Sequence, residues 1–296
     1  MDLSRFPFRG ETRSLDDAAR ASAPGQLLDL PGGKTHYLLE GPSDGQPVVL
    51  VHGLSVPSYT FTPTTAGLTE NGLRVLSYDL FGRGYSDRPA GRYDLDFFNS
   101  QLTDLLDALG IRGPVNLAGL SMGGPIAAYF TVRNPARVRR LCLIDPAGLI
   151  PFGGSLSGKL LRTPLAGEVM LNFFARRILI DTVPNDLLHP ERFPEFMAQY
   201  PPQMEFRGFR QAILATLRGG ALAEQTALYR ALGTLDIPLL ALWGEADHTF
   251  PPALAAERLQ AIVPQCRLEI IRGAGHIPHY EQPGLVNPLL AEFFKA

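Results

Sequence analysis

The sequence predicts an α/β fold with a doubly wound, mostly parallel sheet and an inserted helical cap. Short apolar runs alternate with segments of helical periodicity, which is typical of parallel strands covered by helices on both faces. The alternation stops after Asp145 and resumes near Leu239, which leaves room for an insertion. With 296 residues, of which 45% are hydrophobic, the chain can bury one large core and carry such an insertion.

Short apolar runs bounded by turn residues are the candidate buried strands. They are residues 47–51, 74–78, 115–118, 141–144, 239–243 and 267–271. A β-hairpin is expected at residues 26–40, because Pro31-Gly-Gly-Lys34 suits its turn. Helices are expected where apolar residues recur at helical spacing, which is at residues 95–109, 125–134, 253–262 and 287–295.

The interruption in the alternation predicts how the chain is divided. A structureless loop of that length is uncommon in a compact domain, and residues 151–218 contain helical stretches separated by prolines. The insertion is rich in aromatic residues and methionine, most of which we expect to form its own small core. We therefore expect an N-terminal arm over residues 1–25, a core formed by residues 26–147 and 231–296, and a helical cap, or lid, over residues 148–230.

Composition excludes several classes of function. The formal net charge is −2, which gives no electrostatic basis for binding nucleic acid. The sequence has no apolar stretch long enough for a membrane span and no signal-peptide pattern at its start, so we expect a cytoplasmic protein. Neither Cys142 nor Cys266 has metal-ligand spacing to a histidine, and we expect no metal and no cofactor. Whether the chain forms a homo-oligomer stays open.

The segment Gly119-Leu-Ser-Met-Gly123 joins a predicted strand to a predicted helix. A serine between glycines at such a turn matches G-x-S-x-G, in which the serine hydroxyl is exposed above the carboxyl end of the sheet. The glycines leave room where a Cβ atom would clash with the neighbouring strand and helix. A plain glycine-rich turn is the simpler alternative, and it weakens if the partners of a nucleophilic serine follow in the chain.

A serine needs a base to become a good nucleophile, and the base needs a carboxylate to orient it. His276 follows the last apolar strand on a glycine-rich loop, whereas the nearby His279 is expected to be structural. Asp247 follows the strand at 239–243, and Asp145 is a second candidate for the acid. The order Ser121, Asp247, His276 is the one expected for this architecture.

Two backbone N–H groups are candidates for an oxyanion hole. The N–H of Met122 follows the serine at the start of a helix, where the helix dipole favours negative charge. The loop His52-Gly-Leu-Ser55 follows the strand at 47–51 and can bend over the serine, so the N–H of Leu54 is the second candidate. His52 is expected to organise this loop rather than to act as the base.

Together these motifs resemble the α/β-hydrolase family over nearly the whole chain from about residue 26. The segments that carry the resemblance are His52-Gly53, Gly119-x-Ser121-x-Gly123, Gly244-x-x-Asp247, Gly275-His276 and Asp79-Leu-Phe-Gly-Arg-Gly-Tyr-Ser-Asp-Arg-Pro89. The resemblance implies a nucleophile at Ser121, an acid at Asp247, a base at His276, oxyanion amides at Leu54 and Met122, and a helical lid at about 148–230. It also implies structural roles for Asp79, Arg83 and Ser86.

Single residues separate the branches of this family. Haloalkane dehalogenases and epoxide hydrolases use a carboxylate nucleophile, whereas this chain has Ser121. The C–C bond hydrolases of the meta-cleavage type usually carry a tryptophan after the catalytic histidine, and this chain has Ile277. We therefore expect a serine carboxylesterase or monoester hydrolase for small to medium, largely apolar esters. A C–C bond hydrolase, a cofactor-free perhydrolase and a small-molecule receptor remain alternatives.

The charge of the insertion suggests one further hypothesis about the substrate. Residues 151–218 contain eight lysines and arginines against six aspartates and glutamates, a balance of +2. A lid arginine that pairs with a substrate carboxylate would suit a monoester of a dicarboxylic acid. We favour the simpler interpretation, which is that these cations belong to a solvated surface.

Overall fold

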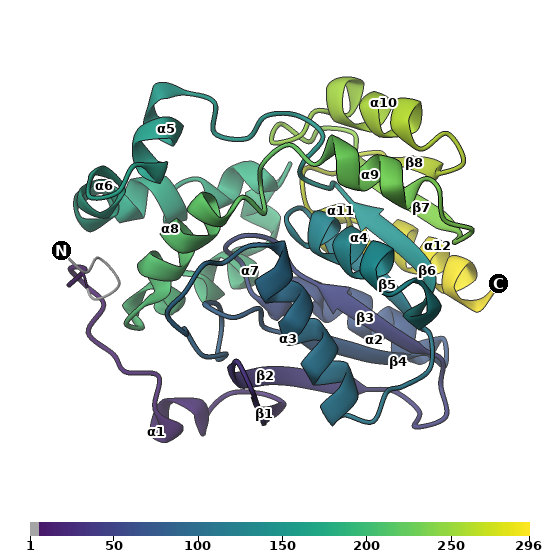
Figure 1. Cartoon of the computed structure of the whole chain (residues 1–296), viewed down its shortest axis with the longest axis horizontal. Coiled ribbons are helices and arrows are strands. Elements are labelled where there is room, and N and C mark those ends of the chain that lie inside the picture. Colours follow the sequence, from purple (N-terminus) through teal and green to yellow (C-terminus); the bar gives the residue numbers. More distant parts are fainter. Residues whose placement is uncertain (1–5) are drawn as a thin grey trace.

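The computed structural model describes residues 6–296 and contains one twisted sheet with helices on both faces (Figure 1). Within these residues the sheet has eight strands in the order β1-β2-β4-β3-β5-β6-β7-β8. Strands β3 to β8 are parallel, and β2 pairs antiparallel with both β1 and β4. The strands are β1 (Gln26–Leu30), β2 (Gly33–Glu40), β3 (Pro47–Val51), β4 (Arg74–Tyr78), β5 (Val115–Leu120), β6 (Val138–Ile144), β7 (Leu239–Gly244) and β8 (Arg267–Ile271).

Helices cover the two faces of the sheet, as expected for a doubly wound fold. On one face α3 and α4 pack against each other, and on the other α2 packs against α12 (Figure 1). The central strands β3, β5 and β7 are almost entirely buried and mostly apolar, because they are covered from both sides. The helices of the core, on the two faces together, are α2 (Thr62–Glu70), α3 (Leu95–Ala108), α4 (Gly123–Arg133), α10 (Pro252–Ile262), α11 (Pro278–Glu281) and α12 (Pro283–Lys295).

A helical insertion lies between β6 and β7, above the carboxyl ends of the strands (Figure 1). Its α-helices are α5 (Leu156–Arg162), α6 (Ala166–Ala175), α7 (Pro194–Gln199), α8 (Phe209–Gly219) and α9 (Thr226–Leu232), with the short turn η5 (Val183–Asp186) among its connections. The expected cap boundary at residue 230 falls inside α9, a helix that packs against α4 of the core.

The N-terminal arm, residues 6–20, runs along the insertion and ends in the short helix α1 (Asp17–Arg20) (Figure 1). Arg13 forms a β-bridge with Phe206, and the Glu11 carboxylate accepts the backbone N–H groups of Gly208 (2.7 Å) and Arg210 (2.8 Å). At the other end of the arm, Arg20 donates to the backbone oxygen of Tyr85. The arm therefore connects the insertion to the core.

The predicted fold class is confirmed, and the differences concern element boundaries. Helix α2 was not expected, because Thr-Pro-Thr-Thr is rich in β-branched residues and lacks an amphipathic pattern. It is stabilised by packing on α12 and β4. Helix α12 begins at Pro283, before the expected residue 287, since proline suits the first turn of a helix, and Pro288 lies inside it.

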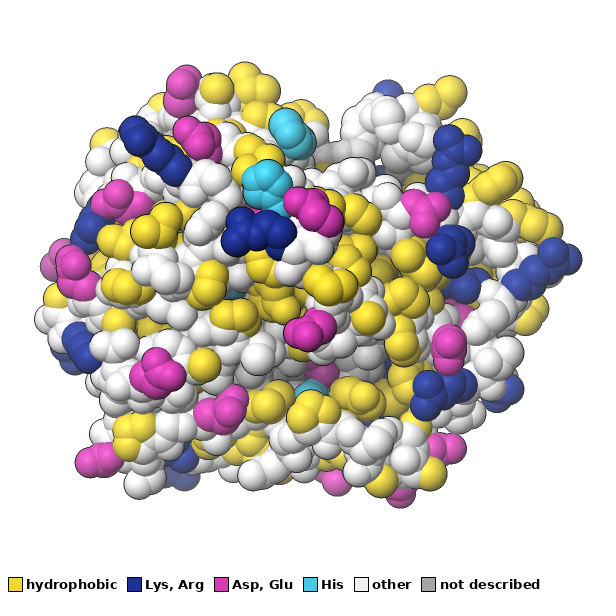
Figure 2. All heavy atoms as spheres, turned by 180° about the vertical axis from the view of Figure 1, so that it is seen from behind, with side chains coloured by type: hydrophobic (Ala, Val, Ile, Leu, Met, Phe, Trp, Pro, Cys, Tyr) yellow, Lys and Arg dark blue, Asp and Glu magenta, His cyan; other side chains and the backbone are white. Residues whose placement is uncertain are grey.

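Charges of both signs are scattered over the face shown in Figure 2, with no extended region of one sign. This agrees with the small net charge of −2. Among residues 6–296, no helix combines the length and the apolarity needed to cross a bilayer.

Candidate active site

Ser121 lies in the sharp turn between β5 and α4 with a φ angle of 52°, in the left-handed region that non-glycine residues rarely adopt. The turn fits only because its neighbours lack side chains. A Cβ atom on Gly119 would lie 2.2 Å from the oxygen of Gly123, and one on Gly123 would lie 2.1 Å from the oxygen of Val51. The backbone N–H of Ser121 donates to Ile144 of the adjacent strand (2.8 Å). The structure thus holds Ser121 at the carboxyl end of the sheet.

Asp247 and His276 follow the neighbouring strands β7 and β8, and the structure brings them into contact. His276 Nδ1 lies 2.9 Å from Asp247 Oδ2. The other carboxylate oxygen, Asp247 Oδ1, accepts the backbone N–H groups of Thr249 (2.7 Å) and Phe250 (3.1 Å). The aspartate is therefore fixed from one side by its own loop and holds the imidazole with its free oxygen.

The close approach of these two loops depends on a glycine. A Cβ atom on Gly244 would lie 1.7 Å from the backbone oxygen of Gly275, so no larger residue fits there. Gly275 in turn donates its N–H to the Glu281 carboxylate (2.6 Å). The loop that carries His276 is thereby anchored next to β7.

Burial and charge act in opposite directions on this pair. Burial raises the pKa of Asp247, but the adjoining His276 and the hydrogen bonds outweigh it and hold that pKa below its ordinary value. Burial likewise lowers the pKa of His276, but the Asp247 charge outweighs burial and the net pKa of His276 is raised. The pair thus favours a carboxylate beside an imidazole that readily accepts a proton.

Ser121 and His276 face the same cavity, which has a volume of about 360 Å³ beneath the insertion. Most of its lining is apolar and comes from the core loops and from the insertion. The aliphatic and aromatic residues are Leu54, Val56, Leu120, Phe152, Leu161, Ile178, Leu179, Phe196, Ile213, Leu217, Leu222 and Ile277. Of the insertion's aromatic residues, Phe152 and Phe196 line the cavity, whereas Tyr200, Phe206 and Phe209 are buried.

The loop after β3 runs beside Ser121. A Cβ atom on Gly53 would lie 3.4 Å from Ser121 Cβ, so the backbone there passes close to the hydroxyl. Within residues 6–296, the backbone N–H groups of Leu54 and Met122 have no hydrogen-bond acceptor. Arg83 Nε donates to the oxygen of Leu54 (2.8 Å), which fixes the loop from behind. Two unpaired N–H groups near a serine can bind an oxyanion.

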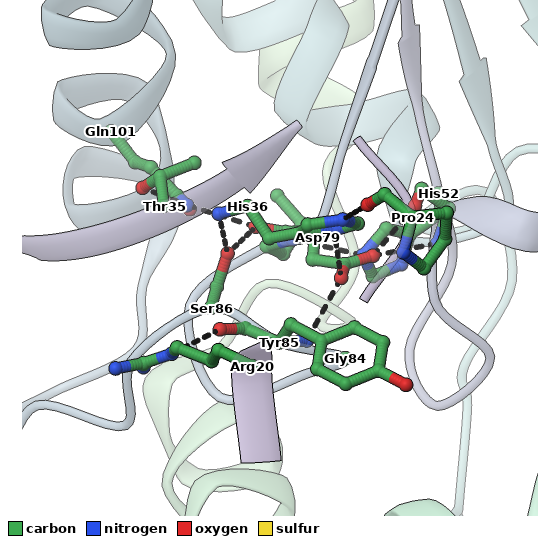
Figure 3. A network of polar contacts seen from close by, with 12 residues as sticks. Arg20, Pro24, Thr35, His36, His52, Asp79, Gly84, Tyr85, Ser86 and Gln101 are labelled. Atoms are coloured by element: carbon green, nitrogen blue, oxygen red, sulfur yellow. Dashed lines mark hydrogen bonds and ion pairs between the residues drawn. The ribbon is translucent and has the colours of Figure 1, made fainter. Parts of the chain in front are cut away.

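A buried polar network supports this loop (Figure 3). Asp79 accepts hydrogen bonds from His36 Nδ1 (2.7 Å), Ser58 Oγ (2.7 Å) and the N–H of Tyr85 (2.9 Å). His52 donates from Nδ1 to Gly53 (2.9 Å) and accepts the N–H of Leu80 at Nε2 (2.9 Å). These contacts are consistent with loop-organising roles for Asp79 and His52.

The pKa values in this network reflect the same contacts. Burial opposes the charge on Asp79, yet the His36 contact outweighs it and holds the pKa of Asp79 well below its ordinary value. Burial lowers the pKa of His36, but the bond to Asp79 outweighs it and raises that pKa. Around His52, burial dominates and lowers its pKa to about 4. Asp79 and His36 thus favour an ion pair, whereas His52 stays neutral.

The remaining histidines, His189, His248 and His279, are absent from the described lining of the cavity. His248 and His189 are exposed, and His279 is buried with its ring 4.7 Å from that of Phe61. The eight lysines and arginines of residues 151–218 are all absent from the described cavity lining. Several have other partners: Arg218 pairs with Glu168 (2.6 Å), and Arg176 lies 3.7 Å from Asp181.

Two further aspartates lie near His276. Asp145, the second candidate for the acid, lies close to Asp247 and His276. One carboxylate or ring atom from each of the three residues lies within 4.8 Å of the other two. Asp186 comes from the insertion and lines the cavity. The sequence offered no signal for Asp186, because it follows no strand and belongs to no motif.

The fold and the arrangement at the strand ends define the class of protein. Residues 46–283 match the family model described as alpha/beta hydrolase fold, so the chain belongs to that family. The chain is similar to "Carboxylesterase YbfK" of Bacillus subtilis, with 27% identity over 88% of this chain and 84% of that protein. A putative non-heme chloroperoxidase of Synechocystis is 30% identical over 85% of this chain and 92% of that protein.

Among solved structures, the chain resembles a meta-cleavage product hydrolase from Pseudomonas fluorescens, in a mutant form complexed with acetates. The TM-score is 0.73 and the identity 26%, and the match covers 92% of this chain and 97% of that protein. The relatives thus carry the names of several different activities on one fold.

Proposed function

We propose that this protein is a serine hydrolase that cleaves carboxylic esters of small to medium, largely apolar substrates through an acyl-enzyme. The observation that carries the proposal is the cavity of about 360 Å³, which Ser121 and His276 line together and which is otherwise mostly apolar. Asp247, 2.9 Å from the far nitrogen of the imidazole, supplies the third group. The similarity to a named carboxylesterase supports the same reaction.

In this proposal His276 takes the proton of Ser121 as the hydroxyl oxygen attacks the ester carbonyl. The N–H groups of Leu54 and Met122 donate to the oxyanion that forms. The alcohol leaves with the proton from His276, and an acyl group remains on Ser121. Water then gives a proton to His276 as it attacks the acyl carbon. The bond from the acyl carbon to Ser121 Oγ breaks, His276 returns the proton to that oxygen, and the acid is released. Asp247 holds the imidazole in place and stabilises its positive charge.

The insertion acts as a cap in this proposal. Its apolar side chains line the cavity from above, which favours substrates with apolar acyl chains. The boundaries of this cap, expected at 148–230, would be tested by limited proteolysis.

Hydrolysis of p-nitrophenyl esters with acyl chains from acetate to decanoate tests the proposal. We expect turnover by the wild type and a loss on the order of 10⁴-fold or more in Ser121→Ala, because the nucleophile is removed. Ser55→Ala is the matched control, since Ser55 lines the same cavity, and it should retain activity within about tenfold. Wild-type inactivity toward every ester, or an active Ser121→Ala protein, would refute the proposal.

A second reaction is suggested by the relative named as a chloroperoxidase. The same acyl-enzyme could transfer its acyl group to hydrogen peroxide instead of water, giving a peracid and the free serine. Adding peroxide to the ester assay and measuring peracid distinguishes the two reactions. Peracid formation that depends on Ser121 would support this activity, and acid as the sole product would exclude it.

A further inference from the structure

The cavity beneath the insertion contains one carboxylate besides its apolar lining. Among the described lining residues, the ionisable side chains are those of His276 and Asp186, and no lysine or arginine is present. Asn185, Thr182 and Thr249 also line the cavity, and Thr249 Oγ1 lies 3.5 Å from Asp186 Oδ1. A mostly apolar cavity therefore contains one carboxyl group together with other hydrogen-bonding side chains.

The backbone around Asp186 is fixed to the loop that carries His276. The N–H of His276 donates to the backbone oxygen of Asp186 (2.8 Å). The N–H of Leu188 donates to Glu281 Oε1 (2.7 Å), and the other oxygen of Glu281 accepts from Gly275 (2.6 Å). Because these bonds involve the backbone, they hold Asp186 in position without using its carboxylate.

The Asp186 carboxylate itself has few hydrogen-bond or charge partners among the described residues. Its one hydrogen bond within residues 6–296 comes from Thr249 Oγ1 at 3.5 Å, the limit for such a bond. None of the ion pairs among these residues includes Asp186. Burial raises its pKa, with His276 acting in the opposite direction. A weakly paired carboxyl group facing a cavity can accept a hydrogen bond from a ligand.

We propose that Asp186 is a specificity-determining residue: it accepts a hydrogen bond from a hydroxyl or ammonium group on the substrate and repels a substrate carboxylate. The substrate class is then esters that carry a hydrogen-bond donor within reach of Asp186, beside the loop that carries His276. Monoesters of dicarboxylic acids, the class that a lid arginine would have favoured, are disfavoured. This inference rests on the proposed ester hydrolysis and adds the substrate class to it.

The test uses p-nitrophenyl esters of equal chain length that end in a methyl, hydroxyl, ammonium or carboxylate group. We compare kcat/KM in the wild type, in Asp186→Asn and in Asp181→Asn. Asp181 is a matched control because it belongs to the same insertion, is exposed and does not line the cavity. Ratios to the methyl-terminated ester remove any effect on the chemical step that all four esters share.

Relative to the methyl ester, we expect Asp186→Asn to gain about tenfold on the carboxylate ester and to lose about tenfold on the ammonium ester. The ratio for the hydroxyl ester should change less than the ratio for the ammonium ester. The asparagine oxygen still accepts a hydrogen bond from the hydroxyl group, whereas the negative charge that attracts the ammonium group is lost. Asp181→Asn should keep the wild-type ratios. Unchanged ratios in Asp186→Asn overturn the inference, as does a uniform change on all four esters, which would mean that Asp186 acts through His276.

A binding measurement separates this inference from the ester hydrolysis. If the wild type hydrolyses none of the esters, the shift in Tm produced by hexylammonium and by hexanoate is compared in the same three proteins. A larger shift with hexylammonium in the wild type, lost in Asp186→Asn and kept in Asp181→Asn, supports the site without turnover. Equal shifts in the wild type and Asp186→Asn overturn it.

Discussion

Asp145 is a third carboxyl group close to His276, and its environment differs from that of Asp247. Its φ angle is 41°, in the left-handed region. Its Oδ1 accepts the N–H of Gly244 (3.0 Å), whereas its Oδ2 is buried and has no partner among the described residues. Burial, reinforced by the Asp247 charge, raises the pKa of Asp145 well above its ordinary value. The environment of Asp145 therefore favours its neutral form, which leaves Asp247 as the charged partner of the imidazole.

This difference predicts unequal effects of one substitution at the two positions. Asp145→Asn replaces a carboxyl group whose neutral form is favoured by a neutral amide of similar shape, so kcat/KM for an ester near neutral pH should change by less than about tenfold. Asp247→Asn removes the charge beside His276 and should lower kcat by a factor on the order of 10⁴. Equal losses in the two variants would contradict this assignment.

The strand ends explain which site residues could be predicted from sequence. Ser121, Asp247 and His276 each follow an apolar run, and the carboxyl ends of parallel strands meet at one edge of a sheet. The sequence alone separates Asp247 from Asp145 poorly, since the two residues follow adjacent strands. The 2.9 Å contact with His276 favours Asp247. Asp186 could not be predicted, because its position depends on how the insertion folds back over the sheet. The catalytic roles themselves stay predictions.

At the scale of elements, the turn between β5 and α4 depends on a close approach of three segments. The backbone of Gly123 passes so near β3 that an added Cβ atom would lie 2.1 Å from the Val51 oxygen. Backbone cannot move as easily as a flexible side chain. The turn therefore couples the position of Ser121 to the packing of α4 on the sheet.

Gly123→Ala should reduce the free energy of unfolding by about 1–3 kcal/mol and lower esterase activity, because α4 must shift away from β3. Gly113→Ala is the control: no atom lies within 4 Å of its added Cβ, so its effect should stay within about 0.5 kcal/mol. Urea unfolding measures both. Equal stability of the two variants would show that the turn tolerates a side chain.

The elements themselves could be predicted to different degrees. Strands such as β3 and β7 are apolar along their length, so the sequence locates them well. Helix α2 has a threonine-rich sequence and forms through contacts with α12, which lies at the far end of the chain. Such an element depends on tertiary contacts, and its local pattern does not reveal it.

At the scale of the whole molecule, neutral buried histidines make stability depend on pH. His279 is fully buried against Phe61, and burial lowers its pKa to about 3 from an ordinary value of 6.5. Above pH 6.5 the ring is neutral in both states, so its contribution to stability is fully present. As the pH falls below 6.5, the unfolded chain takes up a proton that the folded protein does not bind, and this contribution is lost.

We expect His279→Phe to weaken the pH dependence of unfolding between about pH 6.5 and 4. The free energy of unfolding of the wild type should fall relative to the variant by up to about 1.4 kcal/mol per pH unit, the value for one proton. The two proteins share all other titrating groups, so the contributions of those groups cancel when the two free energies of unfolding are subtracted. Parallel curves from urea unfolding at several pH values would show that His279 binds its proton equally in both states.

The N-terminal arm has a consequence for the order in which the chain can assemble. Glu11 bonds to Gly208, and 197 residues separate the two in sequence. During synthesis the arm is made before strands β1 to β6, and its partners in the insertion follow these strands in the chain. Contacts across so long a loop close late, because the loss of chain entropy must first be offset by the intervening structure. A segment that is synthesised well before its partners is thus among the last to find its native place.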